Sequence, residues 1–274
     1  MKAIGIADPT RTDGDHFRRV EASLATGRVA ALKGYLGYLH FEPAHPNYRR
    51  YYDLAAKYKI PVMFYTGDTY SPWAKLKYAH PLGVDDVAVD HPNTNFVMCH
   101  IGNPWTTDAA EVIYKNMNVW ADLSGLLVGT EEYLCLRGRA ARQRRNSATA
   151  FKRAIRYSER PNRFLYGTDW PLALMAAYRD FIFEAIPADL HEQVFDENAR
   201  ALPLRTAAHA ARPCDRFDIQ FHSAGVHPCP SSTRSTRAWP ARTRPRKRSR
   251  NCTRLHRRTN SSWGVSERIA HSTK

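Results

Sequence analysis

Cysteine is scarce in this chain of 274 residues, and its spacing is irregular. The five Cys include no Cys-x-x-Cys pair, so the sequence indicates neither a disulfide framework nor a cysteine-based zinc module. No apolar run approaches the ~18 residues of a transmembrane helix. The N-terminal residues also lack the apolar stretch of a signal peptide. We therefore expect a cytoplasmic protein with no membrane partner.

Glycine-rich nucleotide-binding loops are missing as well. Neither GxGxxG nor GxxxxGKS or GxxxxGKT follows any apolar segment, so nothing in the sequence indicates a nucleotide cofactor. The length is nevertheless sufficient for one large α/β domain with a sizeable core.

Short apolar segments alternate with helical patterns over the first 202 residues. Six such segments are expected to be strands, centred on Ile4, Gly34, Met63, Val97, Trp120 and Leu165. Continuous apolar strands separated by helices are typical of a parallel sheet that is covered on both faces. A doubly wound sheet fits this pattern, and so does a barrel. The barrel is favoured because polar residues follow successive strands at Tyr65, His100, Asp122 and Asp169.

The segment 163–171 (RFLYGTDWP) is central to this interpretation. Residues 163–166 are predicted to form a buried strand, and Asp169 follows it directly. A carboxylate at the carboxyl end of a buried strand is where an α/β barrel places its chemistry. The alternative is that Asp169 caps the next helix or shapes a turn. A second segment has the same construction, because the strand predicted at 95–100 ends in His100 and a Gly/Pro loop with Trp105 follows.

Five segments resemble the amidohydrolase-related family, the branch of its superfamily that includes aminocarboxymuconate-semialdehyde decarboxylase and related hydrolases and decarboxylases. They are 60–68 (IPVMFYTGD), 96–103 (FVMCHIGN), 119–125 (VWADLSG), 164–171 (FLYGTDWP) and 196–201 (DENARA). Their order is that of the family, and the resemblance covers residues 3 to about 202.

The resemblance implies a (β/α)8 barrel that uses a divalent metal, usually zinc, to act on a small carboxylic or cyclic substrate. Asp169 resembles the eighth-strand Asp, which holds the metal and acts as general base. His100 resembles the sixth-strand His, an acid/base group that we also expect beside the metal. Trp105, Trp170 and Tyr65 are candidates for the walls of the substrate site, and rim packing is the alternative for the two tryptophans.

The sequence departs from the family pattern in two places. The first segment resembles the third strand of the family, so the His-x-His pair of the first strand is missing, and Tyr65 stands where a His is expected after the fifth strand. We therefore expect an incomplete barrel of about six strands over residues 1–204 with impaired activity. A catalytically inactive member is the alternative. Open sheet edges also predict marginal stability or a homo-oligomer.

Most of the formal net charge of +15 belongs to the last 70 residues. Residues 205–274 contain 16 Lys and Arg against three Asp and Glu, whereas residues 1–204 contain 25 against 23. The Arg/Ser/Pro-rich tail has no hydrophobic period and is predicted to be disordered. It could bind nucleic acid electrostatically. The interpretation that we favour is an out-of-frame translation of a GC-rich gene, which yields the same composition.

Overall fold

The computed structural model describes residues 3–128 and 139–202. Its sheet consists of β1 (Ala3–Ile6), β2 (Val29–Gly34), β3 (Val62–Tyr65), β4 (Phe96–Cys99), β5 (Val119–Asp122) and β6 (Phe164–Leu165). All neighbours pair in parallel, and the spatial order β1-β2-β3-β4-β5-β6 is the sequence order. A doubly wound sheet reverses direction at a switch point, so the sequential order identifies a TIM-type barrel arrangement. The expected fold class is confirmed for this part of the chain.

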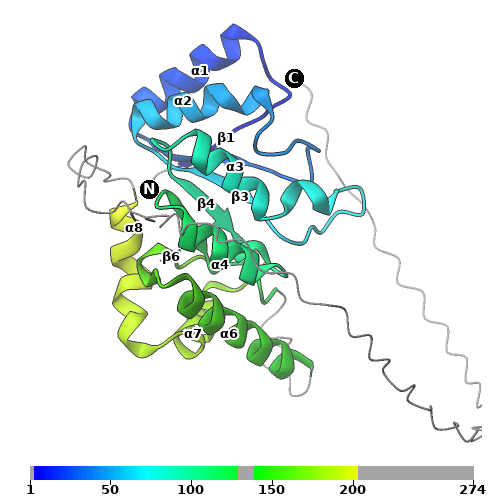
Figure 1. Cartoon of the computed structure of the whole chain (residues 1–274), viewed down its shortest axis with the longest axis vertical. Coiled ribbons are helices and arrows are strands. Elements are labelled where there is room, and N and C mark those ends of the chain that lie inside the picture. Colours follow the sequence, from blue (N-terminus) through cyan, green and yellow to red (C-terminus); the bar gives the residue numbers. More distant parts are fainter. Residues whose placement is uncertain (1–2, 129–138, 203–274) are drawn as a thin grey trace, which may run out of the picture. The chain divides into compact units, whose positions relative to one another are not determined.

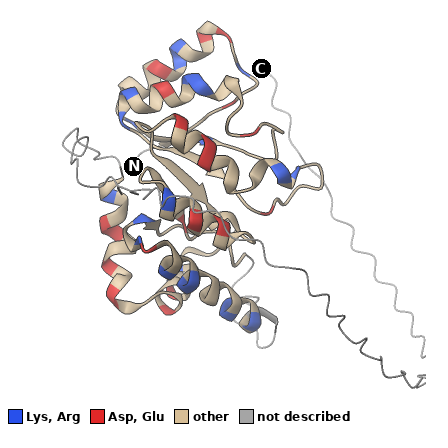
Figure 2. Cartoon of the chain, viewed as in Figure 1, with Lys and Arg blue, Asp and Glu red and all other residues tan. Residues whose placement is uncertain are grey.

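Helices follow the strands and cover one face of the sheet (Figure 1). They are α1 (Gly14–Ala25), α2 (Arg49–Tyr58), α3 (Leu82–Asp90), α4 (Thr106–Lys115), α6 (Arg139–Ser158), α7 (Met175–Ala185) and α8 (Asn198–Ala201). Local signals set their ends: the Asp13 carboxylate accepts a hydrogen bond from the His16 N–H at the start of α1, and Lys59 adopts a left-handed conformation at the end of α2. Figure 2 shows basic residues along α6, where residues 139–158 include seven Lys and Arg and no acid.

The main core lies between the sheet and the helices. Tyr48 and Tyr52 pack there against the strand residues Phe64 and Phe96, whose rings stack 6.0 Å apart. The tyrosines of residues 48–58 recur at helical spacings such as three and four, and they pack in or against this core. Burial of these rings accounts for much of the hydrophobic stabilisation of this layer.

Alternate strand residues form a smaller cluster on the other face of the sheet. Val97, Trp120 and Leu165 pack with Leu202, and Met63 lies against them. Strand side chains alternate between faces, so this is the face that a closed barrel turns inward. The same alternation places the strand ends Tyr65, Cys99 and Asp122 on this inner face.

β1 and β6 form the two edges of the sheet, and each pairs on one side within the described residues. Ile4 and Ile6 of β1 are 52% and 57% exposed. Beside them, a groove of about 270 Å³ lies between β1, β2 and α1. Such an edge presents unpaired backbone groups to other chains.

The strand predicted at residues 163–166 is shorter than expected, because β6 contains Phe164 and Leu165 alone. Arg163 belongs to a preceding 3-10 turn, and its guanidinium lies 4.4 Å from the centre of the Trp120 ring. After Leu165 the ladder ends, because the Tyr166 N–H donates to the Val194 carbonyl at 3.0 Å. The C-terminal helical segment thus replaces the continuation of the strand.

No helix in residues 3–128 and 139–202 is long and apolar enough to cross a membrane. The predicted domain boundary at 204 and the tail at 205–274 lie outside the described residues.

Candidate functional site

The loops after β4 and β5 meet in a hydrogen-bonded network around His100. Oδ1 of Asp122 accepts three hydrogen bonds, from the backbone N–H of His100 (2.8 Å), the backbone N–H of Ser124 (3.0 Å) and the Ser124 hydroxyl (2.5 Å). The Ser124 oxygen lies 2.9 Å from Nδ1 of His100. All three side chains are buried, so the network is held in place away from water.

This network determines which ring nitrogen of His100 carries the hydrogen. The hydroxyl of Ser124 has a single hydrogen, and the short contact assigns it to the Asp122 carboxylate. Nδ1 of His100 must then donate to Ser124, so Nε2 of the neutral ring is an acceptor. Nε2 is buried and has no hydrogen-bond partner among the described residues. A buried acceptor without a partner is costly, which favours a role for Nε2 in binding a ligand.

Gly125 makes room for the His100 ring. A Cβ at this position would lie 2.4 Å from Nδ1 of His100, and the backbone has a φ of +73°. Both facts favour glycine. Tyr178 of α7 fixes the same loop, because its hydroxyl donates to the Leu123 carbonyl (2.6 Å) and accepts from the Leu126 N–H (3.2 Å).

Asp169 lies in the loop after β6, which passes close to the network. A Cβ on Gly167 would be 3.2 Å from Cβ of Ser124, so the two loops are in contact. Asp169 has a φ of +62° and His100 a φ of +61°, a conformation that few residues other than glycine adopt. Such strain persists where the surrounding structure imposes it, often at functional sites. Within the described residues the Asp169 carboxylate makes no hydrogen bond or ion pair.

Tyr65 and Lys33 lie at the same carboxyl edge of the sheet, where β2 and β3 end. The Tyr65 ring lies 4.7 Å from the His100 ring, and Nζ of Lys33 lies 5.8 Å from the centre of the Tyr65 ring. Burial alone would lower the pKa of the Lys33 ammonium, but nearby acidic groups, Cys99, Asp122 and Asp169 among them, outweigh burial and raise this pKa. Lys33 was missed at the sequence level. The available signal was a charged residue inside an apolar strand.

Cys99 is the last residue of β4 and lies beside this edge. Burial, and after it the neighbouring Asp122 carboxylate, raises the pKa of the Cys99 thiol well above its ordinary value. A nucleophilic cysteine needs the opposite environment, one that stabilises the thiolate. Cys99 is therefore a packing residue.

A family comparison decides what kind of protein carries this site. The amidohydrolase family model matches residues 3–202, about three quarters of the chain. The chain belongs to the amidohydrolase family. No curated protein matches the sequence.

Solved structures resemble this amidohydrolase in fold. An uncharacterized TIM-barrel protein from Bordetella bronchiseptica matches with a TM-score of 0.54 at 20% identity, over 73% of this chain and 66% of that chain. 5-Carboxyvanillate decarboxylase from Sphingomonas paucimobilis matches with a TM-score of 0.51 at 14% identity, again over 73% and 66%. A zinc-bound amidohydrolase from Burkholderia multivorans has a TM-score of 0.44 at 14% identity, over 74% and 82%. The chain thus spans just under two thirds of the first two structures.

The metal expected in an amidohydrolase does not fit the described residues. Catalytic zinc sites use three protein ligands. Residues 3–128 and 139–202 contain no group of three His, Cys, Asp or Glu side chains that could hold a metal ion. At the position predicted for a fifth-strand His, the structure places the Tyr65 ring. His100 and Asp169 remain predicted ligands from two neighbouring loops.

The two tryptophans predicted to line the substrate site differ in surroundings. The Trp105 ring packs 4.8 Å from the ring of His80, which in turn lies 3.3 Å from Asp108. Trp170 follows Asp169 directly and is 67% exposed. The structure therefore brings Trp170 to the rim beside Asp169 and leaves Trp105 next to His80. Their contact with a substrate stays a prediction.

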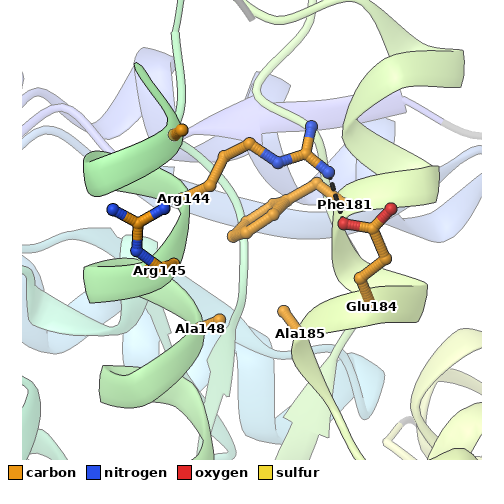
Figure 3. Close-up of a pocket in the computed structure, with 7 residues that line it drawn as sticks. Arg144, Arg145, Ala148, Phe181, Glu184 and Ala185 are labelled. Atoms are coloured by element: carbon orange, nitrogen blue, oxygen red, sulfur yellow. Dashed lines mark hydrogen bonds and ion pairs between the residues drawn. The ribbon is translucent and has the colours of Figure 1, made fainter. Parts of the chain in front are cut away.

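A separate hollow of about 320 Å³ lies between α6 and α7 (Figure 3). Arg144 spans it, because its guanidinium forms an ion pair with Glu184 (2.5 Å) and lies 5.5 Å from the centre of the Phe181 ring. Arg144 and Glu184 thus neutralise each other across this hollow. None of the described residues that line it has an unpartnered buried polar atom like Nε2 of His100.

Proposed function

We propose that this chain is a hydrolase or decarboxylase of the amidohydrolase family that acts on a small carboxylic or cyclic substrate. The observation that carries the proposal is the unpartnered Nε2 atom of His100, which the Ser124–Asp122 network holds as an acceptor at the carboxyl edge of the sheet. Family membership supports the reaction class. The choice between hydrolysis and decarboxylation depends on the substrate.

His100 is suited to proton transfer near neutral pH. Nε2 can accept a proton from a substrate or a water molecule and return it later. As the ring becomes charged, the Asp122 carboxylate stabilises it through the Ser124 hydroxyl. In this proposal Asp169 is the second base, and Tyr65 and Trp170 form walls of the substrate site.

A divalent metal, zinc by resemblance, belongs to the family pattern, but the described residues do not form its site. This observation favours a second candidate function, a catalytically inactive member that keeps the fold and binds ligands. The two candidates differ in turnover, which can be measured directly.

The test uses the full chain, a panel of small carboxylic acids and lactones, and assays for CO2 and acid release. Each assay is run without metal and with added zinc or manganese, and bound metal is counted by mass spectrometry for the wild-type chain and Asp169→Ala. We expect His100→Asn to lower turnover about 100-fold or more, and the matched change His191→Asn, at a histidine that bonds the Phe183 carbonyl, to leave it unchanged. Turnover that survives His100→Asn contradicts the assigned role. No turnover in any condition establishes the inactive member.

A further inference from the structure

We propose that Lys33 is the cation that binds the carboxylate of the substrate. The inference deepens the proposed function, because it takes the carboxylic class of substrate from it. Binding, however, can be measured without turnover.

The position of Lys33 in β2 brings it to the inner face of the sheet. Its register partner is Met63, which packs against the inner cluster, and Lys33 itself is half-buried. It is the residue before Gly34, which ends the strand. A side chain as long as lysine reaches from here to the carboxyl edge, where barrel enzymes bind their ligands.

In the part of the chain that the structure describes, the ammonium of Lys33 has aromatic neighbours and no anionic contact. Nζ lies 5.3 Å from the centre of the Tyr35 ring and 5.8 Å from that of Tyr65. Within the described residues Lys33 forms no hydrogen bond and no ion pair, whereas Lys57 and Lys115 each bond a carboxylate. The acidic groups at this place act on the ammonium from a distance and do not contact it, so its N–H donors remain available to a ligand carboxylate.

A second unpartnered group borders the same ring. The His100 side chain is 4% exposed, its Nε2 has no partner among residues 3–128 and 139–202, and its ring lies 4.7 Å from the ring of Tyr65. Tyr65 therefore lies between a cation and a proton acceptor that both lack partners among the described residues. A substrate held by its carboxylate at Lys33 would lie along Tyr65 with its reacting end near His100.

The other charges at this edge explain why a cation is needed. Asp122 and Asp169 are both close enough to influence Lys33 electrostatically, and they would repel an anionic ligand. Asp122 is already neutralised in part by three hydrogen bonds. The ammonium offsets the remaining field of Asp169, and its positive charge also opposes the binding of a metal cation at this place.

The probes are benzoate and benzamide, which have nearly the same shape and differ in charge. Aromatic probes are chosen because the rings of Tyr35, Tyr38 and Tyr65 lie in edge contacts beside Lys33. Dissociation constants are measured on the full chain by ligand-observed NMR. The variants are Lys33→Met, Lys33→Arg and the control Lys57→Met, which removes an exposed lysine paired with Glu21.

We expect the wild-type chain to bind benzoate about tenfold more tightly than benzamide. Lys33→Met should abolish this preference and keep benzamide binding, which shows that the site is still folded. Lys33→Arg should retain most of the preference, and Lys57→Met all of it. Equal affinities for the two probes in the wild-type chain, no binding of either, or a preference that survives Lys33→Met each overturn the proposal.

The two proposals fail separately. Turnover that requires His100 but is indifferent to Lys33→Met refutes the inference and leaves the proposed function standing. Charge-selective binding through Lys33 without turnover supports the inference and refutes the proposed enzymatic function.

Discussion

Nδ1 of His100 lies 2.9 Å from the hydroxyl oxygen of Ser124, although the two residues are 24 positions apart in the chain. The contact joins the loops after β4 and β5. It also makes Nδ1 the donor and Nε2 the acceptor of the neutral imidazole, because the Ser124 hydroxyl donates its hydrogen to Asp122. The hydrogen-bonding role of His100 thus depends on a residue of another loop.

Replacing Ser124 by alanine should free the His100 ring. The buried Nδ1–H would lose its acceptor, which costs about 1–3 kcal/mol of unfolding free energy, and the fixed tautomer would be lost. Urea unfolding measures the first effect and ¹⁵N NMR of the imidazole the second. Ser23→Ala is the control, because the Ser23 hydroxyl bonds a carbonyl on the exposed face of α1. An unchanged tautomer ratio in Ser124→Ala would show that the network does not hold the ring.

Gly125→Ala tests the close approach to His100. Gly27 provides a matched control, because its φ of +68° resembles the +73° of Gly125 while nothing lies within 4 Å of its added Cβ. Gly27→Ala should cost about 1 kcal/mol for the backbone conformation. Gly125→Ala should cost at least about 1 kcal/mol more, because its Cβ meets the imidazole. Chemical denaturation of both variants gives the difference, and equal losses would mean that the ring moves aside freely.

The contacts of Asp85 should make the free energy of unfolding depend on pH. Burial raises the pKa of Asp85, but hydrogen bonds from Lys115 and Asn116 outweigh burial and lower this pKa below 3.8. A carboxyl whose folded pKa is depressed stabilises the fold above its unfolded pKa, and this contribution is lost as the pH falls through the folded value.

Asp85→Asn should therefore lower the unfolding free energy by about 0.5–1 kcal/mol at pH 7 and have a smaller effect at pH 3. Thermal unfolding at a series of pH values measures the gap between variant and wild type. The neighbouring exposed Asp86 bears the same charge, so Asp86→Asn controls for net charge. A gap that stays constant down to pH 3 contradicts the assignment.

The exposed edge at β1 should drive self-association of the full chain. Light scattering after gel filtration should give a mass above that of one chain, and Ile6→Lys should reduce it, because a charge on an edge strand opposes pairing. Val89→Lys is the matched control, since Val89 on α3 is also 57% exposed. A monomeric wild-type chain that melts sharply would show that the open edge is tolerated.

The strands could be predicted from the sequence because each is a short apolar run between helical patterns, as at Met63 and Val97. Their spatial order could not, since alternation of strands and helices fits a doubly wound sheet equally well. The end of the strand at Leu165 was also missed, because a tertiary bond to Val194 replaces the ladder. Candidates at strand ends, such as His100, follow from the fold class alone.

The partners of those candidates were beyond sequence reasoning. Ser124 and Gly125 form part of a motif, but nothing in the motif indicates that they contact His100 from another loop. Lys33 was overlooked because a single charged residue inside an apolar strand has many structural explanations. Its significance depends on the absence of an ion pair among the described residues, a property that only the three-dimensional arrangement reveals.

Leu202 packs beneath the strands with Val97, Trp120 and Leu165, and its carbonyl accepts a hydrogen bond from the Asn95 side chain (3.1 Å). The change in charge near residue 205 suggests a point at which the tail could be removed. Packing sets a stricter limit. Any version cut before Leu202 would remove a member of the inner-face cluster and leave the Asn95 amide without this acceptor. A shortened protein designed by composition alone could therefore fail for a reason unrelated to the tail.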